Sequence, residues 1–293
     1  MKSSKVAAVL TALVAVFAVS PAAQAASQPN LNSATTFSVL SSSYINTATG
    51  TTLNGDLGYS TPPAVMPTVS GATHVANAVY NQAGIDQATA LAAINGEPCT
   101  YTFPVGAIDL ASDTSRGGTT GEFTPGVYCI DGAASIGGGG TITLSGSGVF
   151  IFRSTGALNT SANSKMVATG GASACSAVWA PGAAATLGAN STFMGTIIDP
   201  AGITIGSTVA WTGRALAFGG TVTSETDTIN TVPQCAAAST STATAAAAAS
   251  IPKTPGLPNS GLATPSAATL PAWSIPAAIA SMLTGAFFLR RFI

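Results

Sequence analysis

Charge is the scarcest feature of this 293-residue sequence, because Asp, Glu, Lys and Arg make up only 6% of it, against about 25% in an ordinary soluble protein. Nucleic-acid binding requires a basic patch, and nine Lys and Arg beside ten Asp and Glu do not supply one. Disorder goes with low hydrophobicity and high charge, whereas 46% of this chain is hydrophobic. The composition therefore favours a packed domain with an uncharged surface.

The residues of common catalytic and metal sites are also scarce. His74 is the only histidine, and the cysteines lack the C-x-x-C and C-x-x-H spacings of zinc sites. The glycine-rich segments 115–121 and 137–140 lack the Gly-Lys-Ser/Thr ending of a phosphate-binding loop, so we interpret them as turns. The acidic residues of this region are too scattered to indicate a glycosidase-type pair: Asp109, Asp113, Glu122 and Asp131. We therefore expect no enzymatic activity, no cofactor and no metal.

Residues 1–25 have the composition of a secretory signal. Lys2 and Lys5 form a basic start, residues 6–19 are apolar, and Ala23-Gln24-Ala25 is a small-x-small cleavage site. A retained N-terminal anchor is the alternative. The pattern predicts an exported protein whose mature chain begins near Ala26.

Four cysteines lie in the part of the chain that is expected to be exported, where disulfides persist. Four cysteines allow three connectivities, and free structural thiols are a further alternative. The sequential pairing, Cys99–Cys129 and Cys175–Cys235, has the shortest loops. In this pairing, the second disulfide would enclose the chain's most repetitive region.

The C-terminal part of the sequence has the composition of a stalk and an anchor. Residues 236–256 are rich in Ala, Ser, Thr and Pro, which is typical of a linker. Residues 257–293 resemble a sortase sorting signal, because a pentapeptide precedes an apolar stretch (275–289) and the basic pair Arg290-Arg291. The pentapeptide consists of Leu257, Pro258, Asn259, Ser260 and Gly261, with Ser260 where Thr is usual. An uncleaved membrane anchor is the alternative, and both predict attachment to the cell surface, at the cell wall or the membrane.

Between the ends, the patterns predict a mainly β domain over residues 26–235. Segments 37–57 and 101–169 alternate apolar and small polar residues, with Gly and Asn at the corners. Residues 149–152 are apolar in succession and are expected in the interior or under a helix. That helix is expected over residues 73–94, capped by Ser70 or Thr73 and with an exposed His74 at its start.

A near-repeat occupies residues 185–223. Thr186 corresponds to Thr204 and Gly195 to Gly213, and the spacing along the chain is the same for every such pair. Periodic β-branched residues punctuated by Gly are typical of a solenoid in which each repeat stacks on the last. The two-residue side-chain period turns the threonines outward, although Thr is also simply a good strand former.

Several segments, in order along residues 31–235, resemble the ice-binding-like domain of bacterial, fungal and diatom ice-binding proteins. They include Asn54-Gly-Asp-Leu-Gly58, Phe123-Thr-Pro-Gly-Val-Tyr128, Ser147-Gly-Val-Phe-Ile-Phe152 and Ser191-Thr-Phe-Met-Gly-Thr-Ile-Ile198. The resemblance implies a right-handed discontinuous β-solenoid of triangular cross-section with one long α-helix packed along its side. It also implies ice as the partner of a flat face rich in Thr, Ser and Ala. We expect a monomeric domain.

Two sets of residues are candidates for the ice-binding face. The first contains Thr186, Asn190, Thr204 and Thr208; the second contains Thr192, Thr196 and Thr212, with Met194 and Arg214 interrupting it. The first hypothesis is a surface-displayed protein that restrains ice growth or recrystallisation, or that holds the cell on ice. The alternative is a non-catalytic adhesin or structural module on the same scaffold. A β-helical polysaccharide lyase or hydrolase is a weaker third, because it requires clustered carboxylates.

Overall fold

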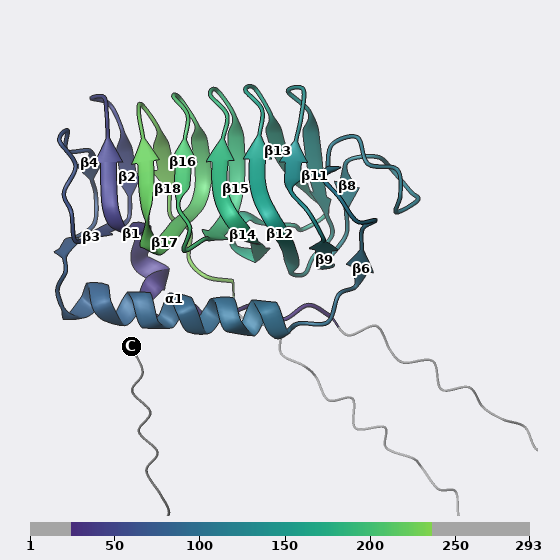
Figure 1. Cartoon of the computed structure of the whole chain (residues 1–293), viewed down its shortest axis with the longest axis horizontal. Coiled ribbons are helices and arrows are strands. Elements are labelled where there is room, and N and C mark those ends of the chain that lie inside the picture. The colour runs from purple at the N-terminus through teal and green to yellow at the C-terminus, as the bar shows by residue number, and fades with distance from the viewer. Residues whose placement is uncertain (1–24, 236–293) are drawn as a thin grey trace, which may run out of the picture. The chain divides into compact units, whose positions relative to one another are not determined.

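The computed structural model describes residues 25–235 (Figure 1). The predicted signal segment (apart from Ala25), the linker, the sorting pentapeptide and the apolar stretch lie outside these residues. The described part is mainly β, as predicted, and its eighteen strands form one sheet with its single α-helix, α1 (Ala78–Gly96), running beneath them. Every strand pairing in it is parallel, and most strands pair with one that follows a little further along the chain. The strands therefore stack side by side along one axis.

The pairings define three ladders, each a row of parallel strands that pair side by side. Helix α1 lies along the first, threonines mixed with longer side chains lie on the second, and an uninterrupted run of threonines lies on the third. The helix-side ladder runs, in spatial order, through β5 (Thr73–Val75), β3 (Asp56–Tyr59), β1 (Phe37–Asn46), β17 (Ala210–Ser224), β15 (Thr192–Ile198), β14 (Ala177–Leu187), β12 (Phe150–Thr160), β9 (Gly126–Ile130) and β6 (Tyr101–Thr102). The mixed ladder runs through β4 (Thr68–Val69), β2 (Thr52–Asn54), β18 (Thr228–Asn230), the starts of β17 and β15, β13 (Lys165–Thr169), β11 (Thr141–Ser145) and β8 (Glu122–Phe123). The threonine-side ladder runs through the ends of β1 and β17, β16 (Ile203–Ile205), the ends of β14 and β12, β10 (Ala134–Ile136) and β7 (Ile108–Asp109).

Long strands turn the corner from one ladder to the next. In β15 and β17 the corner between the mixed and helix-side ladders is at Gly195 and Gly213, which are paired and have φ of +103° and +152°. A Cβ at Gly213 would overlap the carbonyl oxygen of Gly195. Only glycine fits this corner.

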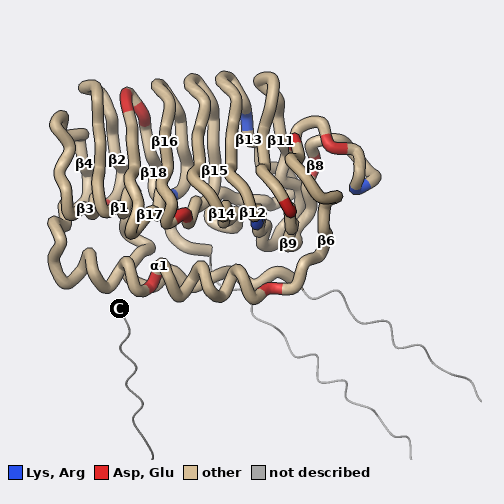
Figure 2. The backbone as a smooth tube through the Cα atoms, in the orientation of Figure 1, with Lys and Arg blue, Asp and Glu red and all other residues tan. Residues whose placement is uncertain are grey.

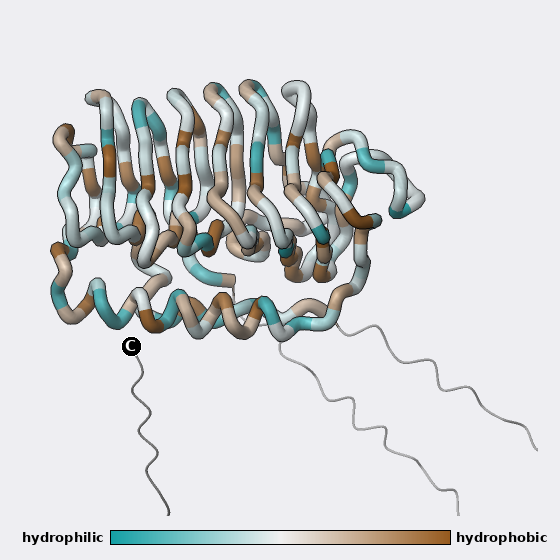
Figure 3. The backbone as a smooth tube through the Cα atoms, viewed as in Figure 1, coloured by the Kyte–Doolittle hydropathy of each residue, from teal (hydrophilic) through white to brown (hydrophobic). Residues whose placement is uncertain are grey.

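The core between the ladders contains a column of aromatic side chains. Phe152 stacks on Trp179 with ring centroids 4.1 Å apart, and Phe193 meets Trp211 edge to face at 5.4 Å. The indole N–H of Trp211 donates to the carbonyl of Gly195 at 2.8 Å, so the buried corner carbonyl has a partner. Figure 3 shows apolar positions recurring along the stacked strands, as a core shared by successive strands requires.

Helix α1 covers the helix-side ladder and begins later than the sequence predicted. Asn77 caps it by accepting the N–H of Tyr80 at 2.9 Å, and the first helical residue is Ala78. Residues 73–75 form β5 instead, because Leu57, Gly58 and Tyr59 of β3 pair with them and extend the ladder by one strand. No helix among residues 25–235 is long and apolar enough to cross a membrane.

His74 consequently lies in β5 rather than at the start of the helix. Its side chain is largely buried, with Nε2 3.6 Å from the carboxylate of Asp56 and its ring 5.3 Å from that of Phe37. The expectation of an exposed histidine is therefore wrong.

Segment 149–152 is divided between two apolar layers, as its consecutive apolar residues predicted. Phe150 and Phe152 point into the aromatic core, whereas Val149 and Ile151 belong to the layer under α1. On the helix, Tyr80, Ala83, Ala90 and Ile94 complete that layer. At Gly84 a Cβ would meet the ring of Phe218 at 2.5 Å, so the helix packs too closely there for a larger residue.

Both disulfides have the sequential connectivity favoured by the sequence. Cys99–Cys129 joins the segment after α1 to β9, and Cys175–Cys235 joins the short helix η2 (Ala174–Ser176) to the end of the described chain. Arg153 lies beside the first disulfide and donates to the carbonyls of Ile94 and Asn95 at 2.9 and 2.5 Å. A cation at the helix C-terminus is favourable, because the free carbonyls there are partly negative. The helix end is thus fixed covalently and electrostatically.

Candidate functional site

One row of outward side chains runs along the threonine-side ladder. We call it the threonine row, and it contains, in spatial order, Ile45, Thr223, Thr204, Thr186, Asn159, Ser135 and Asp109. Adjacent strands in a sheet lie about 4.8 Å apart, so the row presents a side chain at that repeat. Three threonines occupy consecutive strands at its centre.

The backbone of the threonine row is held from below. Thr204 lies between Ile203 and Ile205, which are each 1% exposed, and the neighbours of Thr186 are buried in the same way. Core side chains packed at crystal-like density leave the strand little freedom. The structure therefore places Thr186 and Thr204 side by side and outward, as the two-residue period predicted.

The positions beside the threonine row are also small: Ser43, Thr221, Ala157, Ala183 and Ala184. The larger exceptions are at the ends of the row, where Ile45 is 43% exposed and Asp109 is half-buried. The middle of this face consequently has no long or charged side chain projecting from it among the strands β12, β14, β16 and β17. Figure 2 shows how few charged positions the whole stack carries.

Asn190 and Thr208 lie at the corner where the threonine-side ladder meets the mixed ladder, not on the strands themselves. Asn163, Asn190 and Thr208 occupy equivalent turn positions with φ of +61°, +59° and +61°. The Thr208 hydroxyl donates to the Asn190 side-chain oxygen, and the Asn190 N–H donates to the Ser207 carbonyl at 2.9 Å. Asparagine adopts this left-handed conformation readily, whereas a β-branched residue rarely does. The corner continues the polar surface of the threonine row, with backbone strain at Thr208.

The mixed ladder has threonines too, but longer side chains interrupt it. Thr192 is exposed and Thr212 half-buried, and they lie in different rows because Thr192 pairs with Ala210 and Met194 with Thr212. The strand beyond β15 presents Lys165, and on the same strand Val167 is 40% exposed. This face is therefore rougher and carries a charge near its middle.

Thr196 is not on the second face, contrary to the sequence-based expectation. It is 3% exposed, because β15 turns at Gly195 and its outward side thereafter faces the layer beneath α1 and the N-terminal segment. Its partner Arg214 is 1% exposed and donates from Nε to the Thr35 carbonyl at 2.8 Å. Arg214 therefore does not interrupt any exposed row, and burial lowers its pKa to about 10.

Asn159, Asn163 and Thr223 belong to this surface but were missed by sequence reasoning. The number of residues between the paired positions Asn159 and Thr186 is much larger than the constant spacing of the near-repeat, and the number between Thr204 and Thr223 is slightly larger. The register of β12 against β14 also shifts between Ala157 and Asn159. A search for the pattern Asn or Thr after a Gly-Ala or Ser-Ala turn pair would have found Asn163.

Two buried carboxylates border the threonine-side ladder. Asp199 accepts the N–H of Ala201 at 2.9 Å in the turn before β16, while its Oδ2 has no hydrogen-bond partner among the described residues. Burial raises the pKa of Asp199 to about 6. Asp227, at the opposite edge, accepts the N–H of Val209 at 2.8 Å, and burial likewise raises its pKa. These groups organise the turns that position the row.

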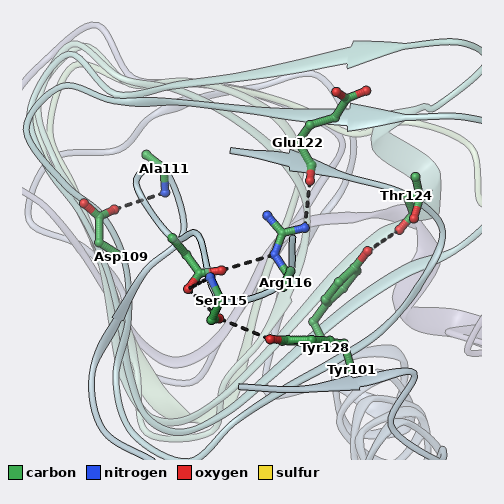
Figure 4. Close-up of polar contacts among 9 residues, drawn as sticks. Tyr101, Asp109, Ala111, Ser115, Arg116, Glu122, Thr124 and Tyr128 are labelled. Atoms are coloured by element: carbon green, nitrogen blue, oxygen red, sulfur yellow. Dashed lines mark hydrogen bonds and ion pairs between the residues drawn. The ribbon is translucent and has the colours of Figure 1, made fainter. Parts of the chain in front are cut away.

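Three further acidic residues, Asp109, Asp113 and Glu122, lie near Arg116 at one end of the stack (Figure 4). The Arg116 guanidinium lies 3.8 Å from the Phe123 ring centroid and donates to the Glu122 carbonyl at 2.8 Å, with Asp113 3.4 Å from its Nε. A cation over an aromatic face is attractive. Arg116 thereby covers the ring of Phe123, which meets Phe152 of the aromatic column edge to face at 5.1 Å.

The carboxylates at this end accept hydrogen bonds within turns. Asp109 accepts from the N–H groups of Ala111 at 3.1 Å and Gly137 at 3.0 Å, and Asp113 accepts from the Ser115 hydroxyl at 2.7 Å. No group of three or more His, Cys, Asp or Glu side chains able to hold a metal occurs among the described residues. The local geometry accounts for these carboxylates as turn-forming groups.

A cleft of about 400 Å³ lies at the edge between the helix-side and threonine-side ladders. Leu91, Ile130 and Pro181 supply apolar walls, and Asp131 accepts the Thr155 hydroxyl at 3.1 Å at its rim. It offers a small ligand an apolar floor with a few hydroxyl and carboxylate groups.

Comparison with known proteins gives consistent matches over the three ladders. The ice-binding-like family model matches residues 39–230. The chain is 32% identical over 245 residues to an ice-binding protein of Nostoc sp. (strain HG1), covering 78% of this chain and 84% of that protein. It is 30% identical over 218 residues to an ice-binding protein of Flavobacterium frigoris (strain PS1), covering 70% and 76%.

A solved structure gives the same result. The fold is similar to the crystal structure of an ice-binding protein from the Antarctic ascomycete Antarctomyces psychrotrophicus, with a TM-score of 0.60, 27% identity, and coverage of 71% of this chain and 100% of the other. The match of the family model to most of the chain, together with these relatives, shows that the chain belongs to the ice-binding-like family.

Proposed function

We propose that this protein binds ice through the threonine row and the corner formed by Asn163, Asn190 and Thr208. The observation that carries the proposal is the run of Thr223, Thr204 and Thr186 on three consecutive strands, facing outward from a rigid core. The relatives named as ice-binding proteins support ice as the partner.

The chemistry of the row suits an ordered water surface. Each threonine presents a methyl group beside a hydroxyl, so it holds water by hydrogen bonding while leaving little hydration to be removed. Strands about 4.8 Å apart repeat this pair along the stack. Charged side chains would keep hydration shells of their own, and none projects onto this face from its central strands.

We further propose that the ladders form a right-handed β-solenoid of triangular cross-section. Three parallel ladders, joined by strands that pass from one to the next, support the three faces. Connections between parallel strands of one sheet are right-handed in about 98% of cases, which supports the handedness. One face would carry the threonine row, one the mixed ladder and one the helix.

The place of action is proposed from the sequence. The secretory composition of residues 1–25 favours export, and the pentapeptide Leu257 to Gly261 with the following apolar stretch favours attachment to the cell wall or membrane. The domain would then be held outside the cell on the linker 236–256, where it restrains ice growth or keeps the cell on ice.

The proposal is tested by ice recrystallisation and crystal shaping with residues 26–235. Thr186→Tyr with Thr204→Tyr places two rings on adjacent strands of the threonine row, and activity should be lost. The matched control is Thr52→Tyr with Thr228→Tyr, which alters two paired outward threonines on the mixed ladder and should leave activity intact. If the Thr186→Tyr, Thr204→Tyr variant keeps full activity, as the control variant should, the threonine row is excluded as the ice-binding surface. An inactive parent domain would exclude ice binding.

The alternative, a non-catalytic adhesin or structural module, has one observation in its favour. The cleft beside the C-terminal end of α1 combines apolar walls with the Asp131–Thr155 pair. An adhesin would retain binding to cells or polysaccharide in the Thr186→Tyr, Thr204→Tyr variant and would show no ice activity in the parent domain.

A further inference from the structure

The point where the chain leaves the domain is linked covalently to the middle of the stack. The last strand, β18, is only three residues long and pairs with the start of β17 and with β2. Cys235, just beyond it, forms a disulfide with Cys175, which lies directly before β14. β14 is an eleven-residue interior strand that pairs with β12 at seven positions. The exit is therefore tied to one of the best-paired strands rather than only to a short one.

A second set of contacts fastens the exit segment to the N-terminal segment. The buried Arg214 donates from Nε to the Thr35 carbonyl at 2.8 Å and from Nη2 to the Val232 carbonyl. Gln234 donates to the carbonyl of Pro29 from its side chain. Because a buried guanidinium without hydrogen-bond partners is costly, Arg214 resists displacement of either segment. The two terminal segments thus hold each other in place.

The disulfide also encloses the central candidate ice-binding residues, whereas Asn159 and Asn163 precede it. Residues 176–234 lie between its two cysteines, and this loop contains Thr186, Asn190, Thr204, Thr208 and Thr223. A pull applied at residue 236 consequently reaches both ends of the loop at once. Neither end of the ice-facing segment can be drawn out alone.

We propose that the Cys175–Cys235 disulfide, reinforced by Arg214, is a mechanical clasp that keeps the ice-facing strands folded while the tail is under tension. The inference rests on the proposed function, because tension arises when the ice-bound domain is held by its C-terminal tail. Without the disulfide, a pull at residue 236 acts first on the contacts of Gln234 and Val232 and then on β18, whose pairings with β17 and β2 span only three residues each. With it, the same pull is carried at once by β14 and its pairings to β12 and β16.

Single-molecule pulling on the mature chain, held at its two ends, tests the clasp directly. The Cys175→Ser, Cys235→Ser variant should release β18 and the exit segment at a lower force than the parent yields at any point. It should also extend roughly 200 Å further on complete unfolding, because about 60 residues at about 3.4 Å each are no longer bypassed. The matched control, Cys99→Ser with Cys129→Ser, removes a disulfide that does not join the exit and should keep the parent's first yielding force. An unchanged first yielding force in the Cys175→Ser, Cys235→Ser variant would overturn the proposal.

A bead assay connects the clasp to function. Beads that carry the mature chain by its C-terminal end are bound to ice under flow, and the lifetime of attachment is measured. The Cys175→Ser, Cys235→Ser beads should detach several-fold faster, while the same variant free in solution keeps its recrystallisation inhibition. Equal lifetimes for parent and variant would contradict the clasp. If parent beads do not attach, ice binding fails, and the pulling measurement still decides the clasp.

Discussion

The threonine-side and mixed ladders share strand β17 yet present different surfaces. β15 and β17 start on the mixed ladder, and β17 ends on the threonine-side ladder. Both ladders place threonines outward, but on the mixed ladder Lys165, Val167 and Met194 project among them. On the threonine-side ladder, Thr223, Thr204 and Thr186 follow one another without interruption. Threonine content alone therefore does not distinguish the two surfaces; uninterrupted order does.

The substitution with the largest expected effect destabilises the whole domain and therefore affects both surfaces. Gly213→Ala drives a Cβ into the Gly195 carbonyl oxygen, at a φ of +152°. Overpacking and backbone strain each cost about 1–3 kcal/mol, so we expect a loss of more than about 3 kcal/mol in the free energy of unfolding. Denaturant unfolding measures it. Gly96→Ala is the control, because nothing lies within 4 Å of its Cβ position; a loss below about 1 kcal/mol at Gly213 would contradict the close approach at the corner.

The next effect is a pH dependence centred on the border of the threonine-side ladder. Burial raises the pKa of Asp199 from 3.8 to about 6, and the pKa of Asp227 is raised as well. A group with a raised folded-state pKa stabilises the fold fully below its unfolded pKa, and this contribution is lost as pH rises through the folded value. We therefore expect the free energy of unfolding to fall by roughly 2 kcal/mol between about pH 4 and pH 7.

Asp199→Asn tests the origin of that dependence. The amide is neutral throughout, so the variant should lose most of the pH dependence between about pH 4 and pH 7. Asp131→Asn, which changes an exposed carboxylate, should keep it. Asp86 acts in the opposite sense, since hydrogen bonds from Ser33 lower its pKa and its contribution is lost as pH falls. A parent protein that gains stability from pH 4 to pH 7 would refute the assignment.

The contrast between the ladders also explains which parts of the site could be predicted from the sequence. Thr186 and Thr204 were found because the constant spacing of the near-repeat equals one strand-to-strand step there. Asn159 and Thr223 were not, because the adjoining steps are longer than that spacing. The step length depends on loops and on the register shift in β12, which the side-chain period does not encode.

Thr196 illustrates a second limit. The two-residue period correctly places Thr192, Met194 and Thr196 on one side of the strand, but the ladder changes at Gly195. After the corner, that side is covered by η1 (Asn32–Thr36) and the layer under α1. The start of α1 was misplaced for a related reason, since pairing with β3 holds residues 73–75 extended. In both cases a distant segment decided the environment.

A smaller effect is expected at the corner between the two ladders. Thr208 has a φ of +61°, which is unfavourable for a β-branched residue. Thr208→Asn keeps a polar side chain beside Asn190 and should stabilise the domain by up to about 1 kcal/mol. Thr186→Asn, in an extended strand, is the control and should be neutral or slightly destabilising. Thermal unfolding distinguishes the two variants, and a destabilised Thr208→Asn domain would show that its hydroxyl and methyl matter more than the strain.

The smallest effect is expected from a substitution that restores an uninterrupted run of threonines on the mixed ladder. Lys165 lies between Thr192 and Thr141 in the row of β15, β13 and β11. Lys165→Thr removes the charge and leaves three consecutive threonines, but Val167 still projects beside them. If order and flatness both matter, recrystallisation inhibition should rise by less than about twofold, or under about 0.5 kcal/mol.

Combining Lys165→Thr with the Thr186→Tyr, Thr204→Tyr background, which is expected to be inactive, isolates the mixed ladder. Substantial activity there would mean that three threonines in sequence suffice and that the roughness of the mixed ladder is tolerated. Absence of activity would indicate that the small flanking residues around the threonine row, such as Ala183 and Ala184, are as necessary as the threonines themselves.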